Sequence, residues 1–275
     1  MMQRTVTGIC LALLLAFTLW LEGPWFSVAF MITLCFSLYE IYHALAKAGH
    51  RPIQWPCWLC LALSIPLFEL VDSKISLLMP LVGGAFMLIS VIVIFRDAPK
   101  LEDILMSAMP LVCALLPGMC MLGLQKAPVR EHQMLLTLLA FGIPLMGDTI
   151  AYFVGSYLGR HKLCPAVSPN KTVEGAVAGL TGSVLFSMAT CWVFPFFSAV
   201  VLPPWWHFLL LGFLCGIAGQ IGDLFASLIK RHCGIKDYSN IFPGHGGMMD
   251  RLDSVYWATV ILYVYLNLAV TTFGA

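Results

Sequence analysis

Acidic, basic and glycine residues crowd into one stretch near the C-terminal end of the sequence, residues 222–254. Three of its cations stand where a polyanion could lie: Lys230, Arg231 and Lys236. The segment 243–247 reads P-G-H-G-G and contains His245, Gly246 and Gly247. Such a turn lets backbone N–H groups approach phosphate oxygens, because glycine has no Cβ to block them. The stretch is a candidate phosphate-binding segment.

Four aspartates could supply oxygen ligands beside these cations: Asp148, Asp223, Asp250 and Asp253. Asp148 and Asp223 fall inside apolar segments, where a carboxylate costs about 2.5–3.5 kcal/mol on insertion scales and normally marks a function or a pair. Asp250 and Asp253 share a face if their turn is helical. Mg²⁺ binds through one or two carboxylates plus substrate phosphates. The sequence therefore predicts a Mg²⁺ site next to a phosphate site.

Each of these features also has an ordinary structural explanation. A Lys-Arg pair at the end of a helix usually anchors that helix at the membrane interface. A glycine-rich turn is usually only a turn, and His245 alone would more often be a turn residue than a catalyst. An aspartate at membrane depth can serve a proton relay or a helix contact. The occurrence of all these features together on one membrane side favours a functional site.

The elements that position these residues are predicted to be membrane-spanning helices, so the fold class is all-α. The chain has 275 residues, of which 60% are hydrophobic and 11% charged, with a mean hydropathy of +0.90. Soluble domains contain roughly 25% charged residues, and the apolar residues here come in long blocks. The net charge of +1 provides no field that would attract nucleic acid. The composition predicts a polytopic membrane protein.

Nine apolar stretches approach the roughly 20 residues that a membrane-spanning helix needs. They are Thr5–Leu21, Trp25–Leu45, Trp55–Leu70, Ser76–Phe95, Ile104–Leu124, Leu135–Gly155, Gly175–Leu202, Trp205–Ile229 and Ser254–Phe273. The first could be a signal peptide, but Arg4 is the one cation before it and no A-x-A cleavage site follows, so we interpret it as a helix.

The distribution of cations predicts the orientation of these spans. With nine spans, Lys74, Lys126 and Arg130 lie on one side of the membrane, and the other twelve of the fifteen Lys and Arg residues lie on the opposite side. Cytoplasmic loops carry an excess of Lys and Arg. We therefore expect the N-terminus inside and the C-terminus outside, in a bacterial inner membrane.

The polar residues divide the chain into two expected regions. Residues 1–132 hold the first five spans, with an expected role in dimer formation and lipid access. Residues 133–275 form the catalytic region, with long cytoplasmic loops at 160–174 and 230–253. Outside the catalytic loops, a C-x-x-C at Cys57 and Cys60 has no second pair at metal spacing, so packing is favoured over a redox or zinc role.

Two segments of the chain resemble the phosphatidate cytidylyltransferase (CDP-diacylglycerol synthase) family. Residues 227–253 read S-L-I-K-R-x4-K-D-x4-F-P-G-H-G-G-M-x-D-R-L-D, which is similar to the family signature in spacing and in many positions. Residues 147–175 provide a second match, with an Arg-His-Lys run and S-P-N-K-T from Ser168. Val173 departs from the Trp that is common in the family, at a position with no proposed ligand role.

The resemblance implies a reaction and assigns expected roles. The reaction is CTP plus phosphatidic acid giving CDP-diacylglycerol and pyrophosphate, in a Mg²⁺-dependent membrane enzyme that forms a homodimer; a second metal ion is an open alternative. Metal ligands would be Asp223 and Asp250, which would act in catalysis with Lys230, Arg231, His245 and Asp253. The residues expected to bind the nucleotide or the cofactor are Lys171, Lys236, Ser168, Asp148, Gly246, Gly247 and Arg251.

Three other functions remain as alternatives. A transporter would use intramembrane acids along an ion path, but it predicts a midplane site and broken helices in two halves. A related transferase that acts on a polyprenol or an archaeal-type lipid would share the CTP site. A structural or lipid-scrambling role would leave the Lys, Asp and Gly constellation unexplained. Glu40 and Glu69 lie in or beside spans, where a local polar contact is favoured over lining a lipid entrance.

Overall fold

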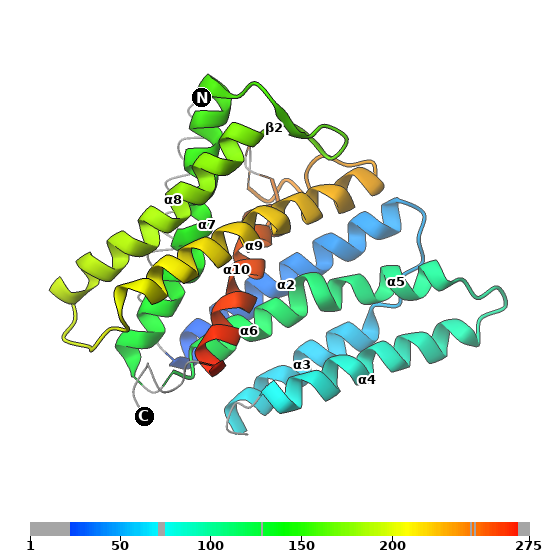
Figure 1. The fold of residues 1–275 in the computed structure, drawn as a ribbon. Helices are drawn as coiled ribbons and strands as arrows, with labels where there is room; N and C mark the ends of the chain where they lie inside the picture. Colours follow the sequence, from blue (N-terminus) through cyan, green and yellow to red (C-terminus); the bar gives the residue numbers. More distant parts are fainter. Residues whose placement is uncertain (1–22, 71–74, 128, 243, 245, 269–275) are drawn as a thin grey trace. The chain divides into compact units, whose positions relative to one another are not determined.

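The computed structural model describes residues 23–70, 75–127, 129–242, 244 and 246–268, and these residues are predominantly helical. The helices are α2 (Gly23–Lys47), α3 (Trp55–Leu70), α4 (Ile75–Ile94), α5 (Leu101–Pro110), α6 (Leu116–Leu124), α7 (Arg130–Leu158), α8 (Val173–Val193), α9 (Trp205–His232) and α10 (Met249–Leu268) (Figure 1). The expected helical class is confirmed for the described residues. A short hairpin of β1 (Lys162–Cys164) and β2 (Ser168–Thr172) is an addition that the prediction of a loop at 160–174 did not contain.

The chain forms two compact units, and each is discontinuous in sequence. The first combines residues 1–123 with 230–251, and the second combines 124–229 with 252–275. The chain passes from one unit to the other three times: inside α6, after Gly123; inside α9, after Ile229; and inside α10, after Arg251. The two regions expected from the sequence, 1–132 and 133–275, concern function and remain a prediction.

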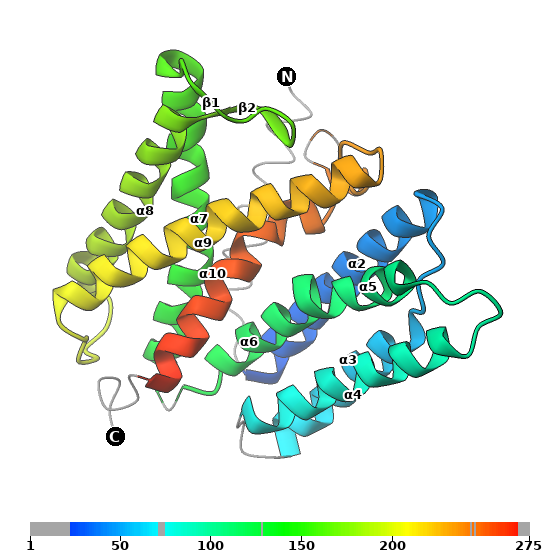
Figure 2. The same ribbon diagram turned by 45° about the vertical axis from the view of Figure 1, so that its right-hand side comes forward.

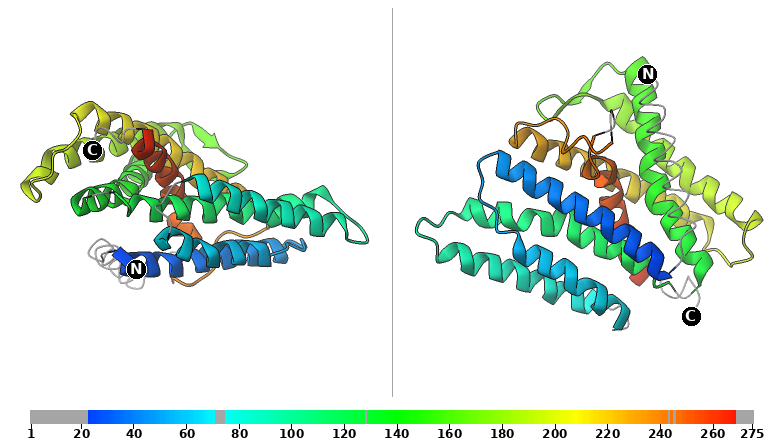
Figure 3. Two further views of the ribbon diagram at one scale, coloured as in Figure 1. Left: turned by 90° about the horizontal axis from the view of Figure 1, so that it is seen from below. Right: turned by 180° about the vertical axis from the view of Figure 1, so that it is seen from behind.

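In the first unit, α2 packs against α5 and the π-helical turn η1 (Leu111–Leu115), while α4 packs against α3 and α5. Figures 1 and 2 show these helices running side by side, and α2 stays next to α5 in the view from behind in Figure 3. Proline lacks a backbone N–H, and the π turn directly follows Pro110. Side chains that are fully buried in this core are Leu34, Leu38, Ile41, Tyr42, Leu45, Leu111, Leu115 and Met119. Cys57 and Cys60 are also buried as free thiols, which agrees with a packing role.

In the second unit, α7 and α8 pack along their length. Small residues allow this close approach, as in many membrane helix pairs. A Cβ added to Gly147 would lie 2.4 Å from Ser183 Oγ, and Ser183 Oγ donates to the Ile143 carbonyl at 3.1 Å. In β1 and β2, which pair antiparallel, Lys162 faces Thr172. Thr172 then caps α8, because its Oγ1 accepts from the Gly175 N–H at 3.1 Å.

Five helices among the described residues are long and apolar enough to cross a membrane. They comprise 25–47, 101–124, 130–158, 173–196 and 205–232. Shorter apolar segments lie within α3, at 55–64, and within α4, at 80–94. Large apolar side chains such as Val177, Leu185 and Trp192 on α8 are exposed, which suits a lipid environment better than water. Helix α10 begins at Met249, ahead of the predicted Ser254. The predicted span Thr5–Leu21 lies outside the described residues.

Candidate functional site

Asp250 is the centre of the polar cluster in the first unit. It lies in the first turn of α10, where a negative charge is favoured by the helix dipole. Its Oδ1 accepts from Lys230 Nζ at 2.6 Å, and its Oδ2 accepts from the N–H groups of Tyr238 and Gly247, both at 2.9 Å. The side chains of Lys230 and Asp250 are 10% and 4% exposed. This carboxylate therefore fixes the last turn of α9 and two points of the loop that follows it.

Lys230 does not have the environment of an interfacial anchor. An anchoring lysine extends its ammonium into water, whereas this one is buried and paired with Asp250. Its Nζ also lies 5.6 Å from the centre of the Tyr238 ring, a favourable position for a cation. The structure thus provides a desolvated cation within the predicted phosphate-binding segment.

Glu40 binds the residues that directly follow the glycine-rich segment. This α2 residue is 1% exposed, and its carboxylate accepts from Ser239 Oγ at 2.5 Å, from Met248 N at 3.0 Å and from Met249 N at 2.7 Å. The last two are backbone donors at the start of α10, which has unpaired N–H groups that need acceptors. Glu40 does make a polar contact, but with Ser239, Met248 and Met249, which are distant in sequence, so the contact is not a local one.

The glycines of this segment satisfy two steric requirements. Gly244 and Gly246 have φ angles of +78° and +85°, which residues with a Cβ adopt rarely. A Cβ on Gly247 would lie 2.4 Å from Glu40 Oε1. Pro243 and His245, which the sequence analysis singled out, lie outside the described residues. The described glycines allow the backbone to fold tightly around the two carboxylates.

Asp223 and Lys171 form an ion pair in the second unit. Asp223 lies on α9, four residues before Ser227, whose Oγ is 3.5 Å from its Oδ1. Lys171 lies on β2, so the hairpin brings a cation from the polar loop to the acid of a membrane helix. Both side chains are partly exposed. Ser168 begins the same strand and pairs with Cys164.

Glu174 braces the base of the hairpin. Its carboxylate accepts from the N–H of Arg160 at 3.1 Å and of His161 at 3.2 Å, and it lies 2.6 Å from His161 Nδ1. These contacts tie the start of the hairpin to the first turn of α8. The polar loop predicted at 160–174 thus contains a hairpin that is hydrogen-bonded to α8 and carries Lys171.

Asp148 and Asp253 are joined through Ser254, which the sequence analysis missed. Ser254 Oγ donates to Asp148 Oδ2 at 3.2 Å, and Ser254 N donates to Asp253 Oδ1 at 2.7 Å. A Cβ on Gly222 would lie 2.8 Å from the Asp253 carbonyl, so α9 and α10 are in close contact here. The structure brings these two predicted acids together within one unit.

The remaining predicted cations lie on the surface: Arg231, Lys236 and Arg251 are all exposed. Arg231 Nη1 donates to the Ile235 carbonyl at 3.1 Å, which keeps it over the loop after α9. Exposed cations near a buried one can attract an anion from water.

The carboxylates suit a hard cation by their chemistry. Each carboxylate offers about four lone-pair sites. Three donors bind the Asp250 carboxylate, which leaves about one site. Asp223 has Lys171 and Ser227 as neighbours. Oxygen donors with spare lone pairs are the ligands that Mg²⁺ prefers. Each acid expected to bind metal is also paired with a lysine expected to bind phosphate, and this arrangement neutralises both charges.

Comparison with known proteins gives a match across most of the chain. The model of the cytidylyltransferase family matches residues 2–269. Over 129 residues the chain is 41% identical to a phosphatidate cytidylyltransferase of Staphylococcus saprophyticus, which covers 47% of this chain and 48% of that protein. A phosphatidate cytidylyltransferase of Bacillus subtilis is 41% identical over 121 residues, covering 44% of this chain and 43% of that protein. The chain spans about half the length of the curated relatives it matches.

Proposed function

We propose that this chain, which belongs to the cytidylyltransferase family, transfers a cytidylyl group from CTP to phosphatidic acid. The products are CDP-diacylglycerol and pyrophosphate. The observation that carries the proposal is the buried Lys230–Asp250 pair beside a glycine-rich turn whose Gly247 N–H is ordered by the same carboxylate. The relatives from Staphylococcus saprophyticus and Bacillus subtilis are phosphatidate cytidylyltransferases, and this name gives the substrate class.

The reaction requires little proton chemistry from the protein. A phosphate oxygen of the lipid attacks the α-phosphorus of CTP, and the bond from that phosphorus to the pyrophosphate oxygen breaks. The electron pair of the broken bond leaves with pyrophosphate. A phosphate monoester is already an anion, so the attacking oxygen needs no strong base. The protein has to align the two phosphates and to offset the negative charge that develops on the leaving group.

The described residues fit these two tasks. Lys230 is a buried cation paired with Asp250, and Lys171 is a partly exposed cation paired with Asp223; each is proposed to contact a phosphate of CTP. Asp250 keeps Lys230 and the Gly247 N–H in place. Exposed Arg231 and Lys236 would attract the triphosphate from water.

Asp223 and Asp250 are the proposed ligands of Mg²⁺. Bound there, the ion would neutralise phosphate charge and orient the reacting oxygens. A second metal ion would need further oxygen ligands, for which Asp148 and Asp253 are the candidates. In either case Lys171 and Lys230 would exchange a carboxylate partner for a phosphate partner.

The proposal extends to the membrane arrangement. Nine spans, with the N-terminus inside and the C-terminus outside, would place the 160–174 and 230–253 segments at the cytoplasmic face of a bacterial inner membrane, where CTP is available. The two acyl chains of phosphatidic acid would remain in the bilayer while the headgroup reaches this face. A homodimer is the proposed assembly.

In the deciding experiment, the purified protein is incubated with Mg²⁺, labelled CTP and one of several acceptor lipids. We expect a labelled lipid product and stoichiometric pyrophosphate with phosphatidic acid, and neither with a polyprenyl phosphate or an archaeal-type lipid. A product formed only with one of those other acceptors would assign the chain to a related transferase. Movement of a substrate into liposomes without covalent change would instead support a transporter.

A further inference from the structure

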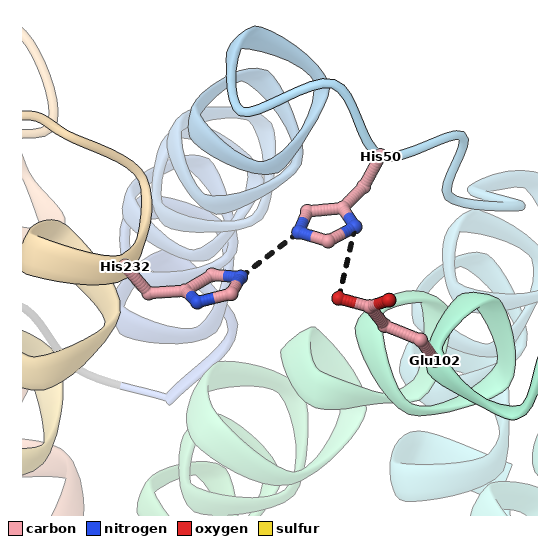
Figure 4. Close-up of side chains that lie close together, drawn as sticks. All are labelled: His50, Glu102 and His232. Carbon is pink, nitrogen blue, oxygen red and sulfur yellow. Dashed lines mark hydrogen bonds and ion pairs between the residues drawn. The ribbon is translucent and has the colours of Figure 1, made fainter.

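Two histidines and a glutamate from three separate segments meet in the first unit. His50 follows α2, Glu102 lies in the first turn of α5, and His232 ends α9. Figure 4 shows the three side chains pointing toward one another. One ligand atom from each lies within 4.8 Å of the other two. Neither the sequence motif nor the proposed transfer reaction uses any of these residues.

The distances are close to those expected between ligands of a common ion. His50 Nε2 and His232 Nε2 are 2.9 Å apart, and His50 Nδ1 is 3.8 Å from Glu102 Oε1. Two ring nitrogens bound to one tetrahedral Zn²⁺ at ~2.0–2.1 Å would be roughly 3.3 Å apart. His50 contacts His232 through Nε2 and Glu102 through Nδ1, and one ion would bind only one of these nitrogens, so side chains must rotate to reach ligand spacing. The Glu102 side chain is 55% exposed, so it can rotate without disturbing the core.

The ligand types select a class of metal. Imidazole suits Zn²⁺ and other late first-row ions, whereas Mg²⁺ prefers oxygen ligands. Two histidines and one carboxylate, with water in the fourth position, are an established tetrahedral set for Zn²⁺. A cation is also favoured beside His232, because this residue lies at the negative end of the α9 dipole. The chemistry of this cluster is therefore distinct from that of Asp223 and Asp250.

The position of His232 separates the cluster from Lys230. Residues two apart on a helix do not face each other, so the two side chains leave the last turn of α9 in different directions. The side chain of His50 is 14% exposed, so most of it is buried. Its ring stacks on that of His232 with centroids 5.1 Å apart. An ion held here would tie the end of α9 to the loop after α2 and to the start of α5.

We propose that His50, Glu102 and His232 form a binding site for one Zn²⁺-class ion, separate from the Mg²⁺ site. The ion would act as a clamp on the turn that carries Lys230. The ordinary alternative is a stacked histidine pair that hydrogen-bonds without metal. The two explanations predict different numbers of Zn²⁺ ions bound per chain: one for the metal site and none for the hydrogen-bonded pair.

The test uses the full chain in detergent, purified through a tag without histidine, stripped with chelator and kept in excess Mg²⁺. Equilibrium dialysis with Zn²⁺ should give about one bound ion per chain, and Co²⁺ should give the visible absorption of a four-coordinate ion that Zn²⁺ displaces. His232→Gln and Glu102→Gln should each weaken binding at least tenfold. The matched control is His161→Gln, because His161 also lies beside a carboxylate, that of Glu174, but without a second histidine.

Two results would overturn the proposal: wild-type protein that binds no Zn²⁺ under these conditions, or His232→Gln protein that binds it as wild type does. Loss of the bound Zn²⁺ ion in His161→Gln protein would also count against the proposal, since that result would place the ion at the hairpin. His232 is exposed, so its replacement should not unfold the protein. Unchanged thermal unfolding of the metal-free variants confirms that binding alone has changed.

Discussion

Two carboxylates, Asp250 and Glu40, accept hydrogen bonds from neighbouring residues of the motif. Asp250 receives one ammonium and two backbone N–H groups, and Glu40 receives one hydroxyl and two backbone N–H groups. Hydrogen bonds to a charged acceptor are stronger than those between neutral groups. The glycine-rich segment therefore owes its shape to two acids.

Asp250→Asn tests the charge of the first acid. The amide keeps the size of the side chain, but it leaves Lys230 without its counter-ion and removes a proposed Mg²⁺ ligand. We expect transfer from labelled CTP to fall at least about 100-fold, as when one group that stabilises a transition state is lost. Asp97→Asn is the control, because Asp97 is exposed and lies outside both segments that resemble the family. A normal rate in Asp250→Asn protein would remove this residue from the metal and lysine-positioning roles.

Glu40→Gln tests the second acid as a positioning residue. The new amide nitrogen would face backbone donors, so at least one buried N–H loses its acceptor, at a cost of about 1–3 kcal/mol. We expect a lower unfolding temperature and a raised KM for CTP, with a smaller change in kcat. Glu131→Gln, at an exposed position in the first turn of α7, is the control. An unchanged KM combined with lower stability would make Glu40 purely structural.

The candidate site could be predicted from the sequence where its residues are close together in the chain. Asp250, Lys230 and Gly247 belong to one motif, so spacing alone grouped them. The partners of Glu40 and the role of Ser254 could not be predicted because they depend on contacts across the fold, and Glu40 lies far from the motif in sequence. A charged residue inside an apolar helix was the available signal for Glu40.

Glycine contacts set the spacing of the helices in the second unit. A Cβ on Gly212 of α9 would lie 2.8 Å from Val184 Cα and 3.1 Å from the Ser183 carbonyl, both backbone atoms of α8. A backbone neighbour cannot rotate away as a side chain can. These two helices therefore approach as closely as they do because position 212 has no side chain.

Gly212→Ala and Gly83→Ala form a matched pair at the scale of helices. Both glycines are helical, but a Cβ on Gly83 would meet nothing within 4 Å. Alanine is favoured over glycine in a helix by up to about 1 kcal/mol, so Gly83→Ala should leave the unfolding temperature in detergent unchanged or raise it. Gly212→Ala should lower it, because α8 and α9 must separate. Equal unfolding temperatures for the two variants would contradict this packing.

The sequence predicted the helices better than the segments between them. Long apolar blocks mark α2, α7 and α9 within a few residues of their observed bounds. The hairpin at 162–172 has strands of three and five residues, too short to show an alternating pattern. Helix α10 begins early because Glu40 accepts from the N–H groups of Met248 and Met249, a contact that hydropathy does not encode.

At the scale of the whole molecule, the two compact units cut across the order of the chain. Residues 230–251, which begin in the last turn of α9, belong to the same unit as residues 1–123. The expected division at residue 132 came from reading the chain in order. It could not reveal that the motif folds with helices from the other end of the sequence, because that association depends on long-range contacts such as those of Glu40.

The proposed orientation can be tested with two matched lysine positions. Lys100, between α4 and α5, is expected inside, and Lys126, between α6 and α7, is expected outside. In a background in which the native cysteines are replaced, Lys126→Cys should react with a membrane-impermeant maleimide added to spheroplasts. Lys100→Cys should react only after the membrane is opened. The reverse pattern would invert the topology, and equal reaction of both before opening would contradict the span count.

The pairing of Lys230 with Asp250 and of Lys171 with Asp223 makes the two kinds of ligand dependent on each other. A divalent cation that binds either acid would compete with the ammonium group already paired with it, and an ammonium that leaves then needs a new anion. A triphosphate that draws a lysine away leaves a bare carboxylate, which needs a new cation. We therefore expect the nucleotide and the ion to bind with positive cooperativity, because each leaves unpaired the charged group that the other binds.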